Sequence, residues 1–330
     1  MEINSNQLAI VILNWNGKNL LEQFLPNVIL HSKEAYIYII DNASTDKSVI
    51  WLEKNHPSIT VIQLEKNLGY AGGYQKGLKQ IDATFYCLLN SDVKVTKGWL
   101  TPIIKLFKNK DIVAIQPKIL DYKNPEYFEY AGAGGGLIDS LGYPYCRGRV
   151  FDCIEKDNGQ YNDTTPIFWA SGACFFVRSA NYWKVGGLDC DYFAHQEEID
   201  LCWRFHNMNK KVMYCGTSTV YHVGGASLNY VSPRKTFLNF RNSLFSILKN
   251  RKGISVFLVL LLRMILDGIA GIQFLFQGKA KHIFAILKAH LSFYASFFKT
   301  LKKRKHIPKR KINYNTQSII VDFFILKKYK

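Results

Sequence analysis

Short apolar runs alternate with segments of helical periodicity through the first part of this 330-residue chain. Most of these runs end at Asn, Asp or Pro, which is typical of buried strands followed by turns. Strands are expected at 8–13, 36–40, 59–64, 84–89 and 112–116. Apolar residues recur every three or four positions in the intervening segments, and helices are expected at 18–31, after Asp46, from the turn at 67–73 to Ile81, and at 97–109. This alternation implies βαβ units with right-handed crossovers and therefore a parallel sheet.

The pattern loosens between residues 121 and 166, where glycines interrupt aromatic-rich pieces and indicate hairpins or a flap. Regular elements then resume: a turn feeding a strand at 169–177, a short helix at 180–185, and a helix around 193–204. The spacing of Ile199, Trp203 and Phe205 predicts the buried stripe of this last helix. Two short strands are expected at 211–214 and 218–221.

Beyond Val231 the chain is apolar and helical in pattern, with helices expected at 237–249, 254–276 and 283–298. The second of these is long enough to span a bilayer but contains Arg263 and Asp267, each costing about 2.5–3.5 kcal/mol at a membrane centre. These two residues are four apart and can pair on one face. The pattern therefore favours a helix that lies in the membrane interface. An ordinary helical subdomain with a solvated charged face remains the alternative.

Charge separates the same two regions. The net charge is +18, yet residues 1–230 carry 22 basic and 23 acidic side chains, whereas residues 231–330 carry 21 basic and two acidic ones. The run at 299–311 is polybasic and follows an apolar helix, a combination that favours an anionic membrane surface over nucleic acid. The seven cysteines include no C-x-x-C pair and indicate a reducing compartment without a zinc site. The N-terminus has no signal-peptide pattern, so a cytoplasmic location is expected.

Polar residues follow four of the predicted strands, as Asn14-Trp15-Asn16, Asp41-Asn42, Asn67-Leu68-Gly69 and Asn90-Ser91-Asp92. In a parallel sheet these ends meet at one edge, where ligands bind. Asp92 is suited to hold a divalent cation against phosphate oxygens, because Mg²⁺ usually takes one or two carboxylates and completes its shell with water and phosphate. The alternatives are that these residues only form turns and that Gly69 is a loop glycine at positive φ. Neither G-x-G-x-x-G nor G-x-x-x-x-G-K-[ST] is present.

A second group of acids, Glu197, Glu198 and Asp200, opens the helix around 193–204. One explanation is electrostatic, because acids are favoured at helix N-termini. Asp200 and Arg204 have the spacing of a supporting ion pair. A carboxylate near an acceptor hydroxyl can also take its proton during a displacement, so catalysis is the other explanation.

Six blocks in this order resemble the family 2 glycosyltransferases of GT-A fold, and especially the bacterial rhamnosyltransferase-like members of surface-polysaccharide assembly. The blocks are Val11–Gly17, Ile40–Asp46, Asn67–Gly73, Leu89–Asp92, Ser171–Ala173 and Glu197–Arg204. The resemblance covers roughly residues 8–225. It implies an α/β fold with a mostly parallel sheet flanked by helices at 1–230. The basic, apolar helices of residues 231–330 complete the expected architecture as a membrane-associating region.

The resemblance also implies roles for individual residues. Asp92 matches the metal-binding last position of a D-x-D-like motif, with Asn90 at its first position. Asp41 and Asn42 match a pair that contacts base and ribose. Glu198 matches the catalytic base, although the usual residue is Asp and Glu197 is the alternative. His222 matches a metal ligand of some members. The remaining expected contacts are Asn14, Trp15 and Gly69 on the nucleotide-sugar side, and Gly172 and Ala173 on the acceptor side.

The resemblance thus implies an inverting, Mg²⁺- or Mn²⁺-dependent transferase that takes a sugar from dTDP-rhamnose or a UDP-sugar. The expected acceptor is a hydroxyl of a surface-polysaccharide or lipid-linked glycan, reached from the cytoplasmic face of a bacterial inner membrane, with no role for nucleic acid. A sugar nucleotidyltransferase is one alternative, but residues 14–18 lack its Gly-rich basic loop. A non-enzymatic basic membrane- or nucleic-acid-binding protein is the other.

Overall fold

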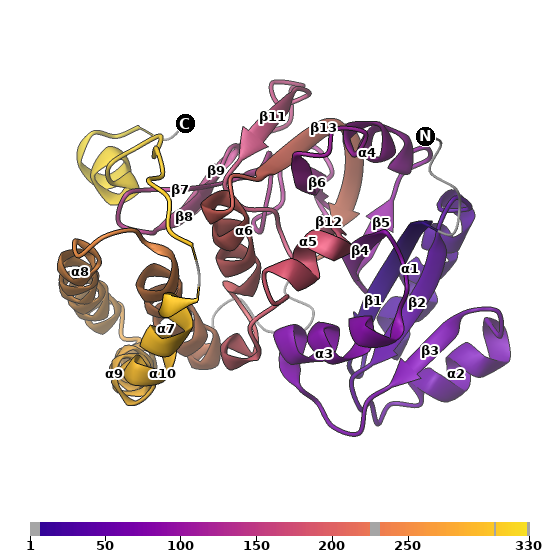
Figure 1. The fold of residues 1–330 in the computed structure, drawn as a ribbon, viewed down its shortest axis with the longest axis horizontal. Helices are drawn as coiled ribbons and strands as arrows, with labels where there is room; N and C mark the ends of the chain where they lie inside the picture. Colours follow the sequence, from indigo (N-terminus) through magenta and orange to yellow (C-terminus); the bar gives the residue numbers. More distant parts are fainter. Residues whose placement is uncertain (1–6, 225–231, 307, 329–330) are drawn as a thin grey trace.

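The computed structural model describes residues 7–224, 232–306 and 308–328. Within these ranges the centre of the molecule is a nine-stranded sheet in the order β11-β13-β6-β12-β4-β1-β2-β3, with β5 paired to β13 (Figure 1). The strands are β1 (Leu8–Asn14), β2 (Tyr36–Asp41), β3 (Thr60–Gln63), β4 (Phe85–Asn90), β5 (Val93–Val95), β6 (Ile112–Asp121), β11 (Thr164–Ile167), β12 (Cys174–Arg178) and β13 (Lys211–His222).

The N-terminal part of the sheet is parallel, as predicted. Strands β3, β2, β1 and β4 are neighbours, and their register sets Asn14 beside Asp41 and Leu13 beside Asn90. The sheet then becomes mixed, because β12 inserts antiparallel between β4 and β6. The two short strands expected at 211–214 and 218–221 are one strand, β13. Strand β13 runs parallel to β6. The break between the two predicted strands corresponds to a register shift between Cys215 and Thr219.

Different helices cover the two faces of the sheet, and successive side chains of β1 point to opposite faces. Ile10 and Ile12 pack with the face covered by α1 (Lys18–His31), α2 (Ser48–Asn55) and α4 (Leu100–Leu106). Ala9 and Val11 pack with the face covered by α3 (Gly69–Gly77), α5 (Ser179–Lys184) and α6 (Glu197–Asn207). Helix α4 is shorter than the predicted 97–109 because Gly98 has φ +75°, which no helix can include.

The Gly-rich segment forms a second, four-stranded sheet, in keeping with the predicted hairpins. Its strands are β7 (Gly136–Ile138), β8 (Pro144–Cys146), β9 (Arg149–Val150) and β10 (Cys153–Ile154). The C-terminal tail returns to this sheet: Ser140 Oγ donates to the Gln317 carbonyl (2.6 Å) and the Ile319 amide donates to Asp139 Oδ2 (3.0 Å). A single π-helical turn, Val321–Ile325, follows.

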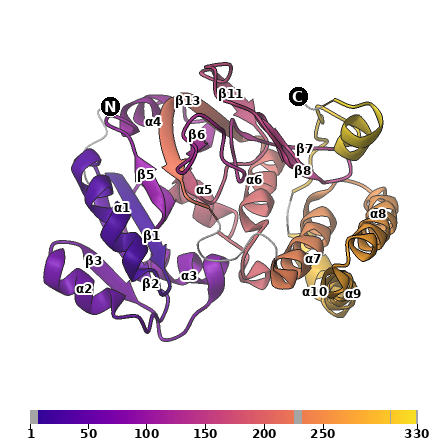
Figure 2. The ribbon, with the colours of Figure 1, turned by 180° about the vertical axis from the view of Figure 1, so that it is seen from behind.

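Within the described residues beyond 231, the α-helices are α7 (Pro233–Asn250), α8 (Val256–Phe276), α9 (Ala280–Ala295) and α10 (Phe297–Lys305). Helix α7 packs on α6, and the other three pack on α7 (Figure 2). The helix expected at 283–298 is divided at Ser296 between α9 and α10. The predicted domain boundary at 230/231 lies outside the described residues. Leu244, Phe245 and Phe293 belong to the same hydrophobic cluster as the sheet, so the helices on either side of that boundary share one core.

The polybasic run is partly engaged with the rest of the protein. Lys303 binds Asp189 Oδ1 (2.5 Å) and Asp191 Oδ2 (2.8 Å), and Lys299 binds Asp191 Oδ1 (2.7 Å). Arg304 donates to the carbonyls of Leu248 and Arg251 at the end of α7. Lys299 and Lys303 thus hold α10 to the loop before α6, and Arg304 holds it to the end of α7, while the membrane contact expected of this run stays a prediction.

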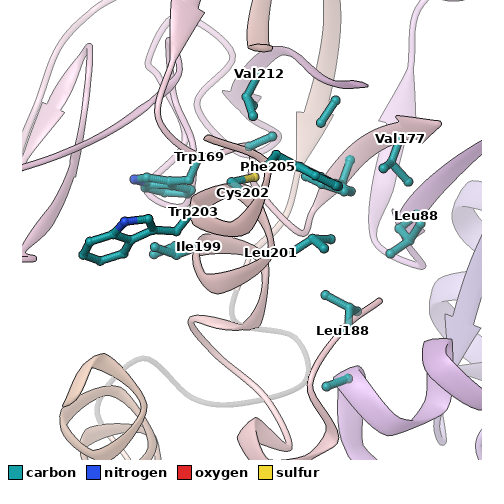
Figure 3. Packing of buried hydrophobic residues seen from close by; sticks show 14 of the residues in the cluster. Leu88, Trp169, Val177, Leu188, Ile199, Leu201, Cys202, Trp203, Phe205 and Val212 are labelled. Carbon is teal, nitrogen blue, oxygen red and sulfur yellow. The ribbon is translucent and has the colours of Figure 1, made fainter. Parts of the chain in front are cut away.

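Helix α6 lies between the sheet and α7, and apolar residues around its circumference are buried. Ile199, Leu201, Cys202, Trp203 and Phe205 all pack inside, in one cluster with Trp169, Val212 and Leu188 (Figure 3). The polar pair Asp200–Arg204 forms as predicted, at 2.8 Å, on the side facing α7. This packing fixes the start of α6, which carries Glu197 and Glu198.

Candidate active site

The first part of the site lies where β1 and β2 end. Asn14 Nδ2 donates to Asp41 Oδ1 (3.0 Å) and Ser44 Oγ (3.1 Å), and the Ser44 amide donates to Asp41 Oδ2 (2.9 Å). Asn14 and Asp41 are buried, while the Trp15 side chain is 50 % exposed. The end of β1 therefore offers a fixed amide–carboxylate pair beside an aromatic ring that a nucleotide base can reach.

The turn after β3 is held by Asn42. Its Nδ2 donates to Asn67 Oδ1 (3.0 Å) and the Gly69 carbonyl (3.1 Å), and its Oδ1 accepts from the Leu68 amide (3.0 Å). Gly69 has φ +71°, and a Cβ there would lie 2.5 Å from the Phe193 carbonyl oxygen. The structure thus gives Asn42 and Gly69 definite tasks in shaping this turn, in addition to the nucleotide contacts predicted for them.

Asp92 and His222 meet at the carboxyl end of β4. His222 is the last residue of β13 and pairs in register with Val93, the residue after Asp92. Its Nε2 lies 3.1 Å from Asp92 Oδ1 and 3.3 Å from Asn90 Nδ2. On the other edge of the ring, Nδ1 lies 3.4 Å from Glu129 Oε1, within ion-pair distance but without hydrogen-bond geometry. All three charged residues are buried.

The neighbouring acidic side chains outweigh burial in setting the pKa of His222. Burial lowers the pKa of His222, but Glu129 and Asp92 outweigh burial and raise that pKa to about 10. Burial raises the pKa of Asp92, yet the charge of His222 and its hydrogen bond hold that pKa below the ordinary value. His222 is therefore held as an imidazolium between the side chains of Asp92 and Glu129.

These residues fit a divalent cation only in part. No group of three His, Cys, Asp or Glu side chains that could hold a metal occurs within 7–224, 232–306 and 308–328. The reason at this site is geometric, since the imidazole separates Asp92 from Glu129. Asp92 Oδ1 and His222 Nε2, 3.1 Å apart, have the separation of neighbouring corners of a metal octahedron with bonds of about 2.1 Å. The protein can thus supply two ligands at one point, and the remaining ligands would have to come from phosphate and water.

Of the second group of acids, Asp200 pairs with Arg204 and Lys249, but Glu197 and Glu198 form no ion pair within the described residues. Glu197 is buried and Glu198 is partly exposed, and among the described residues the Oε2 atom of each is buried without a hydrogen-bond partner. Burial raises the pKa of Glu198 to about 7. Burial and the neighbouring Glu198 raise the pKa of Glu197 well above its ordinary range. A carboxyl with a pKa near 7 can accept a proton at neutral pH.

Tyr70 and the start of β12 connect the two groups. The backbone amide of Asn90 donates to the Ala173 carbonyl (3.0 Å), and the Tyr70 hydroxyl donates to the Gly172 carbonyl (2.7 Å). Burial, Tyr74 and then the charges of Glu197 and Glu198 raise the pKa of Tyr70 well above its ordinary value. Gly172 and Ala173 thus connect the end of β4, through Asn90, with Tyr70, whose surroundings include both glutamates. Ala173 packs in the core.

Sequence reasoning missed Glu129, Tyr70 and Lys235. Glu129 stands alone in the aromatic run Tyr127-Phe128-Glu129-Tyr130, and an isolated acid among aromatics is the one signal that marks it. Lys235, in the first turn of α7, lies near both Glu129 and His195 and influences the pKa of His195. No motif links these residues, because packing of distant segments brings them to the site.

Sequence and structure comparisons relate this chain to known proteins. The family model described as "Glycosyl transferase family 2" matches residues 9–186. The low-salt glycan biosynthesis hexosyltransferase Agl10 of Haloferax volcanii is 22 % identical over 84 % of this chain and 88 % of its own length. An N-acetylglucosaminyl-diphospho-decaprenol L-rhamnosyltransferase of Mycobacterium tuberculosis is 24 % identical over 65 % of this chain and 75 % of its own.

Among solved structures, GalNAc-T7 with UDP, GalNAc and Mn²⁺ superimposes with a TM-score of 0.58 at 16 % identity. The match covers 76 % of this chain and 49 % of that one. At this identity the likeness shows the fold alone. The fold class predicted from the sequence is confirmed.

Proposed function

Because this chain belongs to glycosyl transferase family 2 and has its GT-A fold, we propose that it transfers a hexose or deoxyhexose with inversion from a nucleoside diphosphate to a glycan hydroxyl. That it is a glycosyltransferase using a nucleotide-sugar donor follows from the family; the donor, the acceptor and the chemical mechanism are the proposal. The observation that carries it is the contrast between two carboxyl groups: Asp92 lies beside a cationic partner, whereas the buried Oε2 atom of Glu198 has no hydrogen-bond partner among the described residues.

The donor side takes the nucleoside diphosphate. Trp15 offers an exposed ring to the base, and Asp41 and Asn14 offer polar atoms close to where the ribose would lie. Asp92 and His222 would hold Mg²⁺ or Mn²⁺ once His222 releases its proton, and the bound cation would offset the charge that develops on the leaving diphosphate. The Mn²⁺ in the GalNAc-T7 structure supports this use of a divalent cation.

The acceptor side supplies the base. The acceptor oxygen attacks the anomeric carbon as the bond from that carbon to the diphosphate oxygen breaks, and the Glu198 carboxylate takes the hydroxyl proton. Two observations favour Glu198 over Glu197: it is more exposed, and its pKa of about 7 leaves much of it ionised at neutral pH. Glu197, with a pKa raised well above its ordinary range, supports the site as a neutral acid.

The donor and acceptor we propose are dTDP-rhamnose or a UDP-sugar and a lipid-linked or surface-polysaccharide glycan. The name of the mycobacterial relative supports a rhamnosyl donor and a polyprenyl-diphosphate acceptor. The test is release of nucleoside diphosphate by purified protein from a panel of nucleotide sugars, with Mn²⁺ or with EDTA. Metal-dependent release that requires an added acceptor supports the proposal. Release of pyrophosphate from a nucleoside triphosphate and a sugar phosphate would instead favour the nucleotidyltransferase alternative.

A membrane surface is the proposed location of this reaction, at the cytoplasmic face of a bacterial inner membrane. Among the described residues α8 is the helix long and apolar enough to cross a bilayer. Its outward side is almost entirely apolar, and α9 exposes a second apolar stripe. These exposed side chains are Phe257, Leu258, Leu261, Leu262, Ile265, Ile269, Ile272, Leu275 and Phe276 of α8 and Phe284, Leu287, Leu291 and Tyr294 of α9. So much exposed apolar surface is unusual for a soluble monomer and is typical of a lipid- or protein-binding face.

The charged residues of α8, Arg263 and Asp267, are buried against the rest of the protein. Arg263 donates to the Leu141 carbonyl (3.1 Å), lies 3.6 Å from the centre of the Tyr143 ring and is near Asp267 (3.9 Å), which in turn accepts from His290 (3.1 Å). The middle of α8 thus rests on the catalytic half, which favours a helix lying along the membrane surface over one that crosses it. Flotation with vesicles containing anionic lipid tests this. The triple variant L261Q/I265Q/I269Q should stay with the soluble fraction, whereas wild-type protein that fails to float would contradict it.

A further inference from the structure

We propose that Asn242 of α7 is a positioning residue for the reaction, because its side-chain amide holds the loop that presents Glu198. This inference rests on the proposed function of Glu198. Asn242 lies outside the segment matched by the family model, in the C-terminal region otherwise assigned to membrane contact. It is fully buried, although it is a polar residue on a helix.

The loop before α6 has an unfavourable backbone. Phe193, His195 and Gln196 have φ values of 64°, 69° and 71°, and none of them is glycine. Non-glycine residues at positive φ persist only where surrounding contacts enforce them, and they concentrate at functional sites. Gln196 is the N-cap residue of α6, so these dihedral angles directly set the direction in which Glu197 and Glu198 leave the loop.

The contacts that enforce this backbone come largely from one side chain. Asn242 Nδ2 lies 3.0 Å from the Tyr192 carbonyl oxygen, 3.0 Å from that of Ala194 and 2.8 Å from that of His195. The carbonyl between them, that of Phe193, accepts from the Ala71 amide of α3 (3.1 Å). The loop is therefore fixed on one side by α7 and on the other by the helix that follows the donor-side turn at Gly69.

Arg241 determines the orientation of the Asn242 amide. Its Nε donates to Asn242 Oδ1 (2.9 Å), and a guanidinium has only donors, so the oxygen must face Arg241 and the NH₂ group must face the loop. Arg241 also donates to the carbonyls of Asp191 (3.0 Å) and Tyr192 (3.2 Å). Arg241 and Asn242 thus together fix the backbone carbonyl groups of the loop that precedes Glu197 and Glu198.

The matched pair of variants is Asn242→Asp and Asn207→Asp. Each replaces a buried amide by a carboxyl of the same shape and removes NH₂ donors. Asn207 Nδ2, however, donates to the Asn250 carbonyl (3.1 Å) at the far end of α6, away from the loop. Asn242→Asp should lower kcat about 10- to 100-fold, the cost of misplacing a reacting group by about 1 Å. Binding of UDP, dTDP or GDP with Mn²⁺ should stay within about twofold of wild type, and Asn207→Asp should keep kcat within about twofold.

Two further variants complete the test. Arg241→Met keeps the side-chain stem but releases the amide, and should lower kcat with unchanged nucleotide affinity even if Asn242→Asp does not fold. Asn242→Gln retains the NH₂ donors and should recover part of the activity lost in Asn242→Asp. Folded Asn242→Asp or Arg241→Met protein with wild-type kcat would overturn the proposal.

The same assay separates this proposal from the function on which it rests. Full activity in both Glu198→Gln and Glu197→Gln would refute the proposed catalytic base. The measured effect of Asn242 on kcat would then be interpreted separately from that base. Loss of activity in Glu198→Gln together with normal kcat in folded Asn242→Asp would refute only the role of Asn242.

Discussion

The end of β4 and the start of α6 both bury carboxyl groups, but they treat them in opposite ways. Asp92 is next to a cation, His222, and its pKa is held below the ordinary value. Glu198 has an Oε2 atom without a hydrogen-bond partner among the described residues, and its pKa is raised to about 7. Burial alone disfavours both anions, so the difference arises from the charged partner.

This contrast matches the two tasks of a sugar transfer. A group that binds a metal diphosphate must be an anion throughout, whereas a base must be able to gain and lose a proton near neutral pH. Titratable groups whose surroundings push their pKa values apart are the usual sign of such a division of labour. The predictions below each remove one side of the contrast.

The largest effect is expected from Asp92→Asn. Removing the anion leaves His222 as the only protein ligand at that point, and loss of charge stabilisation on the leaving diphosphate should lower the transfer rate about 10³-fold. Nucleoside diphosphate binding should also lose its dependence on Mn²⁺. Calorimetric titration of UDP or dTDP with and without Mn²⁺ measures this, and retained metal-dependent binding would count against the assignment.

Glu198→Gln should remove the proton acceptor while keeping the size of the side chain. Transfer should fall about 10²- to 10³-fold, within the range of general base catalysis. Nucleotide binding should be unaffected, which distinguishes this variant from Asp92→Asn. Glu197→Gln serves as the control, since a group that is already protonated loses little when it becomes an amide, and a larger loss there would reverse the two roles.

Glu129→Gln is expected to have a smaller effect on the donor side. Carboxylates behind metal-bound histidines orient the ring, and their removal typically weakens metal affinity 10- to 100-fold. The Mn²⁺ concentration for half-maximal activity should therefore rise, with kcat at saturating Mn²⁺ little changed. An unchanged Mn²⁺ requirement would mean that His222 does not bind the metal.

The pH dependence of kcat should reflect the base. Activity should rise from pH 6 to pH 8 by about tenfold around an apparent pKa of about 7, because only ionised Glu198 can accept the proton. Stopped assays across this range with the donor saturated check the prediction. Glu198→Gln should abolish this rise in activity with pH. An identical rise in that variant would show that another group causes it.

The smallest effect concerns stability. The folded-state pKa of Glu198 lies above the unfolded value, so the native state binds the extra proton and loses stability as pH rises from about 4.5 to about 7. Glu198→Gln avoids this buried charge and should be more stable than wild type by about 1–3 kcal/mol at pH 8, and nearly equal at pH 4. Urea unfolding at the two pH values measures the difference. Equal stabilities at pH 8 would contradict an unpaired buried carboxylate.

Much of the donor side could be predicted from the sequence because it depends on local patterns. Apolar runs located the strands, and parallel register then brought Asn14, Asp41 and Asn90 to one edge. Asp92 and His222 also meet as expected, since β5 and β13 pair directly. Asn14, Asp41, Asn90 and His222 each end a strand, and Asp92 lies in the turn between β4 and β5, so finding the strands was enough to find these residues.

The remaining features depend on contacts between segments far apart in the chain. Glu129 lies in the Gly-rich segment and reaches His222 at the end of β13. Asn242 reaches the carbonyls of Tyr192 to His195 from a helix of the C-terminal region, for which the sequence suggested either membrane contact or an ordinary helical subdomain. No spacing rule predicts such contacts. The insertion of β12 between β4 and β6 was missed for the same reason, since antiparallel pairing of residues 85 to 93 positions apart leaves no periodic signal.

The most direct test of the two-carboxylate site is Mn²⁺-dependent binding of UDP, dTDP and GDP measured beside transfer for Asp92→Asn and Glu198→Gln. Both variants should lose transfer, but only Asp92→Asn should lose metal-dependent nucleotide binding. If Glu198→Gln also loses that binding, or if Asp92→Asn keeps it, the proposal that Asp92 binds the metal and Glu198 accepts the proton is wrong.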